Sequence, residues 1–182
     1  MNQSKMKLRN WLLAGLLAGL FFASCKKDDN TTEQENITTI EVHLTGTGGF
    51  EDKFFWRDLD GSGGSAPEID TIVIPAQNLD LNCHIHVYDE SKNPVEDITE
   101  EIEEENTDHL FTYLITGANL TVVPDDVDND GAPFNLETVW KSGAASTGTV
   151  RIRLFHEPSD KTDTNNPGGE VDLDVTFPVK IQ

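Results

Sequence analysis

Basic residues are scarce in this sequence. Its 182 residues include only 13 lysines and arginines, against 33 aspartates and glutamates. Proteins bind nucleic acids through basic side chains that neutralise phosphates, so this composition excludes that class of partner. The negative charge also argues against docking on anionic lipid, and it favours solubility, cation binding or a basic partner surface.

Cysteines are equally scarce, because the chain contains only Cys25 and Cys83. A mature chain that starts at Cys25 has one further cysteine, so it cannot form an internal disulfide. Cys83 lies in an alternating apolar stretch, which predicts a buried, unreactive thiol. The sequence also lacks a serine nucleophile elbow and a phosphate-binding glycine loop. We therefore predict that the chain is not an enzyme.

Long apolar runs are missing, and the stretch at residues 11–22 is shorter than the roughly 20 residues of a membrane-spanning helix. It follows a basic segment and precedes Ala23, Ser24 and Cys25, a pattern typical of a secretory signal. The pattern resembles a bacterial lipobox, which implies removal of residues 1–24 and lipidation of Cys25. The alternative is a plain signal peptide that is cut near Ser24 and leaves a free thiol.

Residues 26–29 (Lys-Lys-Asp-Asp) are similar to the tag that sends lipoproteins of the Bacteroidota to the cell surface. We therefore expect a lipid-anchored protein on the cell surface of the outer membrane, with the periplasmic face as the alternative. Several acyl chains on Cys25 would anchor it stably. Residues 25–36 are polar and predict a flexible tether. Residues 1–24 carry three basic and no acidic side chains, so their removal leaves 10 against 33, a net charge of about −23.

Alternation of apolar and polar residues begins at Ile37 and dominates the rest of the chain. It predicts strands near residues 40–44, 54–56, 69–74, 79–88, 110–116, 119–123, 134–140, 150–155 and 171–181. Many short strands separated by turns are typical of an antiparallel β-sandwich of immunoglobulin or transthyretin type. We therefore predict a single all-β domain over residues 37–182, with one short helix.

The helix is predicted to start at Asn93-Pro94-Val95-Glu96, which combines a capping residue, a proline in the first turn and an acid three residues after the cap. Val95, Ile98 and Ile102 form a narrow apolar stripe. Such a stripe predicts a helix that lies on the edge of the sandwich.

Six segments carry a family resemblance: residues 56–61, 96–102, 116–121, 143–148, 156–158 and 169–172. They resemble a family of small, uncharacterised lipoproteins of the Bacteroidota. Its members often carry the label "type 1 periplasmic binding fold superfamily protein", although that fold is larger and built on parallel βα units. The resemblance implies a link to outer-membrane TonB-dependent receptors and a role in nutrient or metal uptake. It supplies no catalytic residues.

Residues 126–131 read Asp-Val-Asp-Asn-Asp-Gly, and Glu137 lies six positions after the glycine. This spacing matches the calcium-loop template of three spaced oxygen ligands, a glycine turn and a bidentate glutamate. The predicted calcium ligands are Asp126, Asp128, Asp130 and Glu137. Pro133 and the flanking strands depart from the usual context of that loop, so the alternative is an acidic hairpin turn.

The histidines suggest a transition metal. His84 and His86 share one face of a predicted strand, and His43 lies on the polar face of another. If the two strands are neighbours, three imidazoles converge on an ion such as zinc. The second candidate group is His109, His156 and Glu157. The alternative is that these are ordinary solvated side chains, because the spacing matches no metal motif.

These features predict a lipid-anchored, non-catalytic surface or periplasmic binding module that is accessory to outer-membrane nutrient or metal uptake. Its candidate cofactors are calcium and zinc. Its candidate partners are the membrane, through the lipid, and a TonB-dependent receptor. The alternative is a structural or adhesive surface lipoprotein without a small-molecule ligand.

Overall fold

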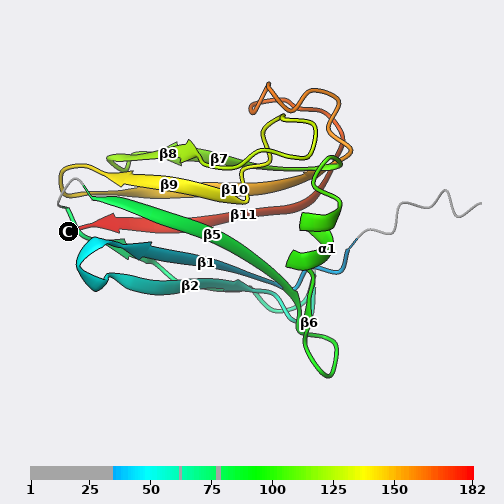
Figure 1. Ribbon diagram of the computed structural model, residues 1–182. Coiled ribbons are helices and arrows are strands. Elements are labelled where there is room, and N and C mark those ends of the chain that lie inside the picture. Colours follow the sequence, from blue (N-terminus) through cyan, green and yellow to red (C-terminus); the bar gives the residue numbers. More distant parts are fainter. Residues whose placement is uncertain (1–34, 62, 77–78) are drawn as a thin grey trace, which may run out of the picture. The chain divides into compact units, whose positions relative to one another are not determined.

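The computed structural model describes residues 35–61, 63–76 and 79–182. These described residues form one compact unit. The predicted signal peptide and Cys25 lie outside the described residues, as does nearly all of the predicted tether. Figure 1 shows two β-sheets with one short helix, α1 (Thr99–Glu104), at one end.

One sheet has seven strands in the order β3-β2-β1-β5-β9-β8, with β6 paired to β5. These strands are β1 (Thr39–Gly46), β2 (Glu51–Arg57), β3 (Glu68–Ile69), β5 (Asp80–Asp89), β6 (Glu96–Asp97), β8 (Leu120–Pro124) and β9 (Glu137–Ser142). A short 3-10 turn, η1 (Thr47–Gly49), connects β1 to β2. All pairs in this sheet are antiparallel.

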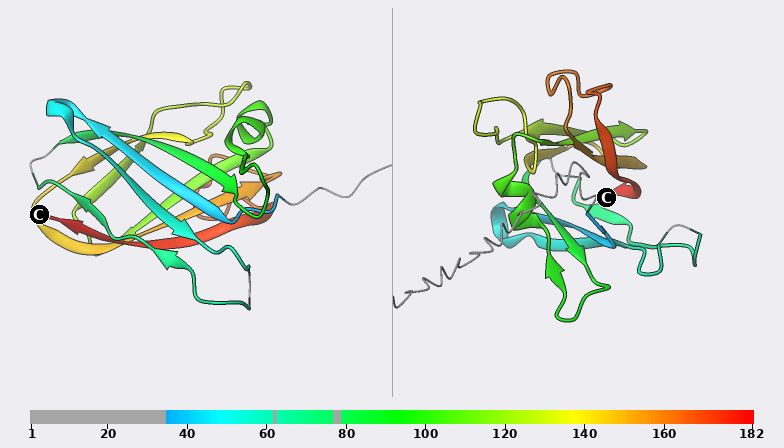
Figure 2. Two further views of the ribbon diagram at one scale, coloured as in Figure 1. Left: turned by 90° about the horizontal axis from the view of Figure 1, so that it is seen from below. Right: turned by 90° about the vertical axis from the view of Figure 1, so that its right-hand side faces the viewer.

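The other sheet has four strands in the order β4-β11-β10-β7. They are β4 (Ile72–Ile74), β7 (His109–Thr116), β10 (Ser146–His156) and β11 (Glu170–Ile181). The β4–β11 pair is parallel and the remaining pairs are antiparallel. The views in Figure 2 show the two sheets stacked as layers, which confirms the predicted all-β sandwich.

A continuous core fills the space between the sheets. The seven-stranded sheet contributes alternate residues of β1 and β5 together with Trp140, and the four-stranded sheet contributes alternate residues of β10 and β11. Burial of a large aliphatic or aromatic side chain stabilises the folded state by about 1.5–3 kcal/mol. Because the strand period is two, the intervening side chains of β1 and β5 all lie on the outer face.

The strand predicted at residues 69–74 is in fact two short strands in different sheets. Glu68–Ile69 pair with β2, whereas Ile72–Ile74 pair with β11. The chain therefore crosses from one layer to the other within this segment. The strand predicted from Phe134 begins only at Glu137, although Phe134 is buried in the core.

The helix begins later than predicted. Glu96 and Asp97 pair with Asp89 and Tyr88 as β6, so the helix starts at Thr99. The predicted apolar stripe is confirmed for Ile98 and Ile102, which are buried in the core. It is wrong for Val95, which is exposed. The ladder hydrogen bonds of β6 outweigh the local capping signal at Asn93.

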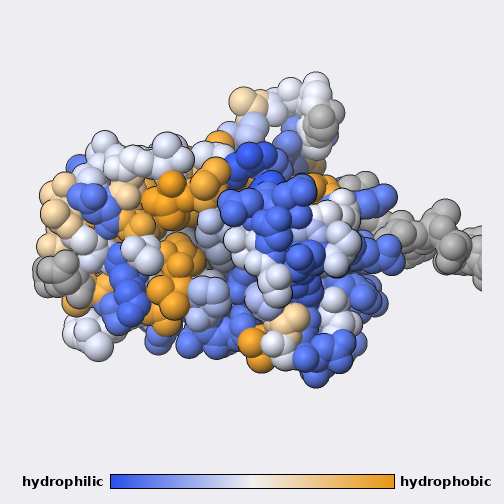
Figure 3. Space-filling view, turned by 90° about the horizontal axis from the view of Figure 1, so that it is seen from above, coloured by the Kyte–Doolittle hydropathy of each residue, from blue (hydrophilic) through white to orange (hydrophobic). Residues whose placement is uncertain are grey.

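The surface is unevenly polar. Figure 3 shows hydrophilic side chains over the end of the domain that carries the long loops, and apolar side chains toward the opposite end of the same face. Within the part of the chain that the structure describes, no helix has the length and apolarity needed to cross a membrane.

Candidate metal centres

The first histidine cluster lies on the outer face of the seven-stranded sheet, where β1 and β5 are neighbours. The antiparallel register sets His43 opposite His84 and Glu41 opposite His86. The ring centroids of His84 and His86 are 4.4 Å apart, and those of His43 and His86 are 6.2 Å apart. We call Glu41, His43, His84 and His86 the open histidine cluster.

Three members of this cluster bring ligand atoms close enough for one ion. Single ligand atoms of Glu41, His43 and His86 all lie within 4.8 Å of one another. Two imidazoles and a carboxylate suit zinc and similar divalent transition metals. The ligands of a tetrahedral zinc are about 3.4 Å apart, as follows from its bond lengths, so small side-chain rotations would close the site.

Glutamates from other elements contact the remaining nitrogens. Nε2 of His43 is 3.2 Å from Glu51, and Nδ1 of His84 is 3.3 Å from Glu137. Nε2 of His84 is also 3.9 Å from Glu103 of α1. Carboxylates in this position orient a metal-binding imidazole and increase its basicity. Because carboxylates face both nitrogens of His84, we do not count this residue among the ligands.

The charges around the open histidine cluster allow a cation to bind there. Lys53 Nζ is 2.8 Å from Oε1 of Glu41, but the lysine side chain is about half exposed and can move into solvent. Burial and the neighbouring His84 lower the pKa of His86. A lowered pKa keeps the imidazole neutral at physiological pH, which is the form that binds metal.

The second predicted group comes together with a different set of acids. His109 and His156 are directly opposite in β7 and β10, with stacked rings 4.8 Å apart. Glu157 is exposed and does not join them. Asp172 of β11 takes its place, and Oε1 of Glu35 lies 3.4 Å from Nε2 of His109. We call Glu35, His109, His156 and Asp172 the junction cluster.

The predicted calcium ligands do not converge on one point. Both carboxylate oxygens of Asp126 accept hydrogen bonds from backbone N–H groups, those of Asn135 and Glu137. The side chain of Glu137 lies beside His84 instead, and Asp130 is exposed. Asp126 therefore acts as a turn residue, in line with the alternative prediction of an acidic hairpin. Calcium binding itself stays a prediction.

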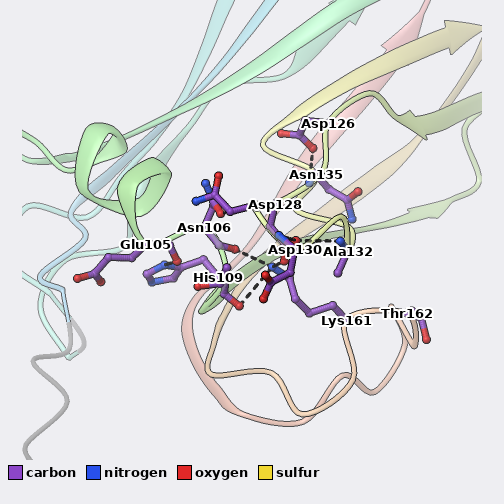
Figure 4. A network of polar contacts seen from close by, with 12 residues as sticks. Glu105, Asn106, His109, Asp126, Asp128, Asp130, Ala132, Asn135, Lys161 and Thr162 are labelled. Carbon is purple, nitrogen blue, oxygen red and sulfur yellow. Dashed lines mark hydrogen bonds and ion pairs between the residues drawn. The ribbon is translucent and has the colours of Figure 1, made fainter.

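Lys161 already neutralises the carboxylate of Asp128 in this loop. Oδ1 of Asp128 accepts the N–H groups of Asp130 and Ala132, and Oδ2 lies 2.6 Å from Lys161 Nζ (Figure 4). Lys161 comes from the loop between β10 and β11, and it also donates to the Asn106 carbonyl at 2.6 Å. Burial opposes ionisation, but Lys161 and the Ala132 N–H outweigh it and lower the pKa of Asp128. Both carboxylate oxygens of Asp128 are therefore already engaged by groups of the protein.

Cys83 is buried beneath the open histidine cluster, as predicted. Burial raises the pKa of its thiol to about 12. A thiolate is the form that binds metals and attacks substrates, so this residue is inert at neutral pH.

Comparison of the chain with protein-family models, with curated proteins and with solved structures finds no match. The function proposed below therefore depends on the geometry of the described residues.

Three acidic members of the clusters were missed by sequence reasoning. Glu41 lies in the strand predicted near residues 40–44, and it is buried. Glu35 lies in the segment predicted as a tether, and Asp172 lies in the strand predicted near residues 171–181. The alternation at residues 40–44 places Glu41 and His43 on one face, so that pair could have been found.

Proposed function

We propose that this chain is a lipid-anchored, non-catalytic module that binds a divalent transition-metal ion on the open histidine cluster. The observation that carries the proposal is the register of β1 and β5, which gathers Glu41, His43 and His86 on the outer face of one sheet. Imidazole and carboxylate ligands favour zinc-class ions over calcium, which prefers oxygen ligands alone.

The position of the cluster supports capture and release more than permanent storage. His43, one of the three proposed ligands, is partly exposed, and it lines a hollow of about 340 Å³ together with His84, Asn82 and Glu137. An ion on such a surface can exchange with solvent. The formal net charge of −20 raises the local concentration of cations around the domain.

The envelope location belongs to the same proposal. The lipobox-like segment before Cys25 supports lipid anchoring in the outer membrane, and the acidic tag supports display at the cell surface. Together with the family resemblance, these features make the module an accessory to a TonB-dependent uptake receptor. Replacement of Cys25 by Ala should move the protein from the membrane fraction to the soluble fraction. Unchanged fractionation would contradict the anchor.

Isothermal titration with zinc tests the metal claim. The full-length chain in detergent should bind zinc, and His43→Ala/His86→Ala should lose at least one zinc per chain. Thr45→Ala is the matched control, because Thr45 lies on the same face of β1 beside His43 and offers no imidazole. Equal zinc binding by wild type and the double variant would overturn the proposal. It would leave a structural or adhesive lipoprotein as the better account of this surface.

A further inference from the structure

We propose that the junction cluster is a second, buried site for a divalent zinc-class ion, and that the bound ion fixes the start of the domain to the four-stranded sheet. This second site and the open histidine cluster have only the class of ion in common. They consist of different residues, on different strands, and the two claims can fail separately.

The cluster combines four ligand side chains from four parts of the chain. His109 begins β7, His156 ends β10, Asp172 lies in β11, and Glu35 precedes β1. Single ligand atoms of His109, His156 and Asp172 all lie within 4.8 Å of one another. Two imidazoles and two carboxylates supply the four ligands of a closed divalent site.

The orientation of His109 is set for metal binding. This side chain is fully buried, and its Nδ1 lies 3.1 Å from the backbone carbonyl oxygen of Glu105. A carbonyl oxygen can only accept, so Nδ1 carries the proton and donates it. Nε2, which lies 3.4 Å from Oε1 of Glu35, is then the nitrogen left to bind an ion. A hydrogen bond from the second nitrogen to a carbonyl is typical of metal-binding histidines.

A β-bulge directs Asp172 into the cluster. The β10–β11 register pairs Leu154 with Leu173 but Phe155 with Val171, so Asp172 is the extra residue without a partner. Bulges redirect a side chain and often occur next to functional sites. Without the bulge, strict alternation would place Asp172 and Asp174 on the same outer face.

The cluster holds several buried polar atoms that lack a hydrogen-bond partner. They are Oε2 of Glu35, Nε2 of His109 and both carboxylate oxygens of Asp172. Buried polar groups are normally satisfied, and an unpaired buried carboxylate is costly. A divalent cation bound here would satisfy Nε2 of His109 and an oxygen of Asp172, and Glu35 lies beside His109.

An acidic cleft gives an ion access to the cluster. Glu35 and Asp172 line a cleft of about 590 Å³, and its other walls include Asp58, Asp60 and Trp56. One carboxylate oxygen of Asp58 also lacks a hydrogen-bond partner. Carboxylates along a cleft concentrate cations at its base.

Zinc binding by the His43→Ala/His86→Ala variant tests this site in isolation. We expect this full-length variant, in detergent, to bind one zinc per chain and to gain roughly 5–10 °C in melting temperature at a hundredfold excess over Kd. Adding Glu35→Gln and Asp172→Asn should abolish both effects. These two changes remove buried charges without changing side-chain size, so the metal-free protein should keep its melting temperature.

Glu157→Gln is the matched control, because Glu157 is the adjacent exposed acid and should leave zinc binding unchanged. Hydrogen exchange provides a second readout, in which zinc should slow exchange at residues 35–38 tenfold or more. The proposal is overturned if the histidine variant binds no zinc, or if binding survives Glu35→Gln/Asp172→Asn. Zinc binding without protection of residues 35–38 would overturn the claim that the ion fixes the start of the domain. Glu35→Gln/Asp172→Asn in the otherwise wild-type chain should keep the zinc of the open histidine cluster, which separates the two proposals.

Discussion

The acidic loop around Asp128 and the junction cluster differ in how their ligand atoms are used. In the loop, backbone N–H groups and the ammonium group of Lys161 already satisfy the carboxylates of Asp126 and Asp128. In the junction cluster, four buried polar atoms have no hydrogen-bond partner. Carboxylate oxygens that already accept hydrogen bonds or pair with a lysine stabilise a turn. Ligand atoms that lie close together without hydrogen-bond partners form a candidate metal site instead.

The largest expected effect comes from removing the internal cation of the loop. Lys161→Met leaves Asp128 buried without its partner, and breaking such a pair costs about 3–5 kcal/mol. Urea denaturation measures the change in the free energy of unfolding. Lys141→Met is the control, because its pair with Asp80 is exposed and should matter by less than about 1 kcal/mol. A loss below 1 kcal/mol for Lys161→Met would show that the loop does not depend on this lysine.

The next largest effect distinguishes the zinc ligands of the open histidine cluster from the histidine beside them. His86→Ala should weaken zinc binding about a hundredfold, a loss of about 2.8 kcal/mol, because it removes a direct ligand. His84→Ala should weaken it less than tenfold, because Glu137 and Glu103 face the nitrogens of His84. Competition titration against a zinc chelator measures both constants. Equal losses would mean that His84 is also a ligand.

Acid should reduce the difference between the wild type and Lys161→Met. The folded-state pKa of Asp128 is lowered, so this carboxylate stabilises the fold above its unfolded pKa of about 3.9. That stabilisation is lost as the pH falls through the lowered folded value. Urea titrations at pH 7 and near pH 2.5 should therefore show a smaller destabilisation by Lys161→Met at the lower pH. A constant difference would contradict the ion pair.

The smallest effect concerns calcium. Because Lys161 already pairs with Asp128, one of the predicted calcium ligands, saturating calcium should change the melting temperature of the wild type by less than about 1 °C. Differential scanning calorimetry with and without calcium makes the measurement. A calcium-dependent rise of several degrees that disappears in Asp126→Asn would restore the predicted calcium site.

Much of the fold could be predicted, because alternation reports which face of a strand is buried. The alternation from Leu79 to Tyr88 placed Cys83 in the core and His84 and His86 on the outer face, as the structure shows. Strand neighbours could not be read in this way. The pairing of β1 with β5 decides whether His43 meets His84, and it depends on the packing of the whole sandwich.

The parts of the sites that escaped prediction all depend on long-range geometry. Lys161 lies 33 residues from Asp128, in the loop between β10 and β11. Asp172 reaches the junction cluster through a bulge, which breaks the alternation on which the prediction relied. Local spacing matched a calcium loop at residues 126–137, but it could not show that a distant lysine neutralises that loop.

A zinc-soaked crystal with an anomalous difference map at the zinc edge tests the central claim most directly. We expect one peak among Glu41, His43 and His86, and a second peak in the junction cluster. We expect no peak at the carboxylates of the acidic loop. Zinc bound only at Asp126, Asp128 or Asp130, or no peak at either histidine cluster, would contradict the account.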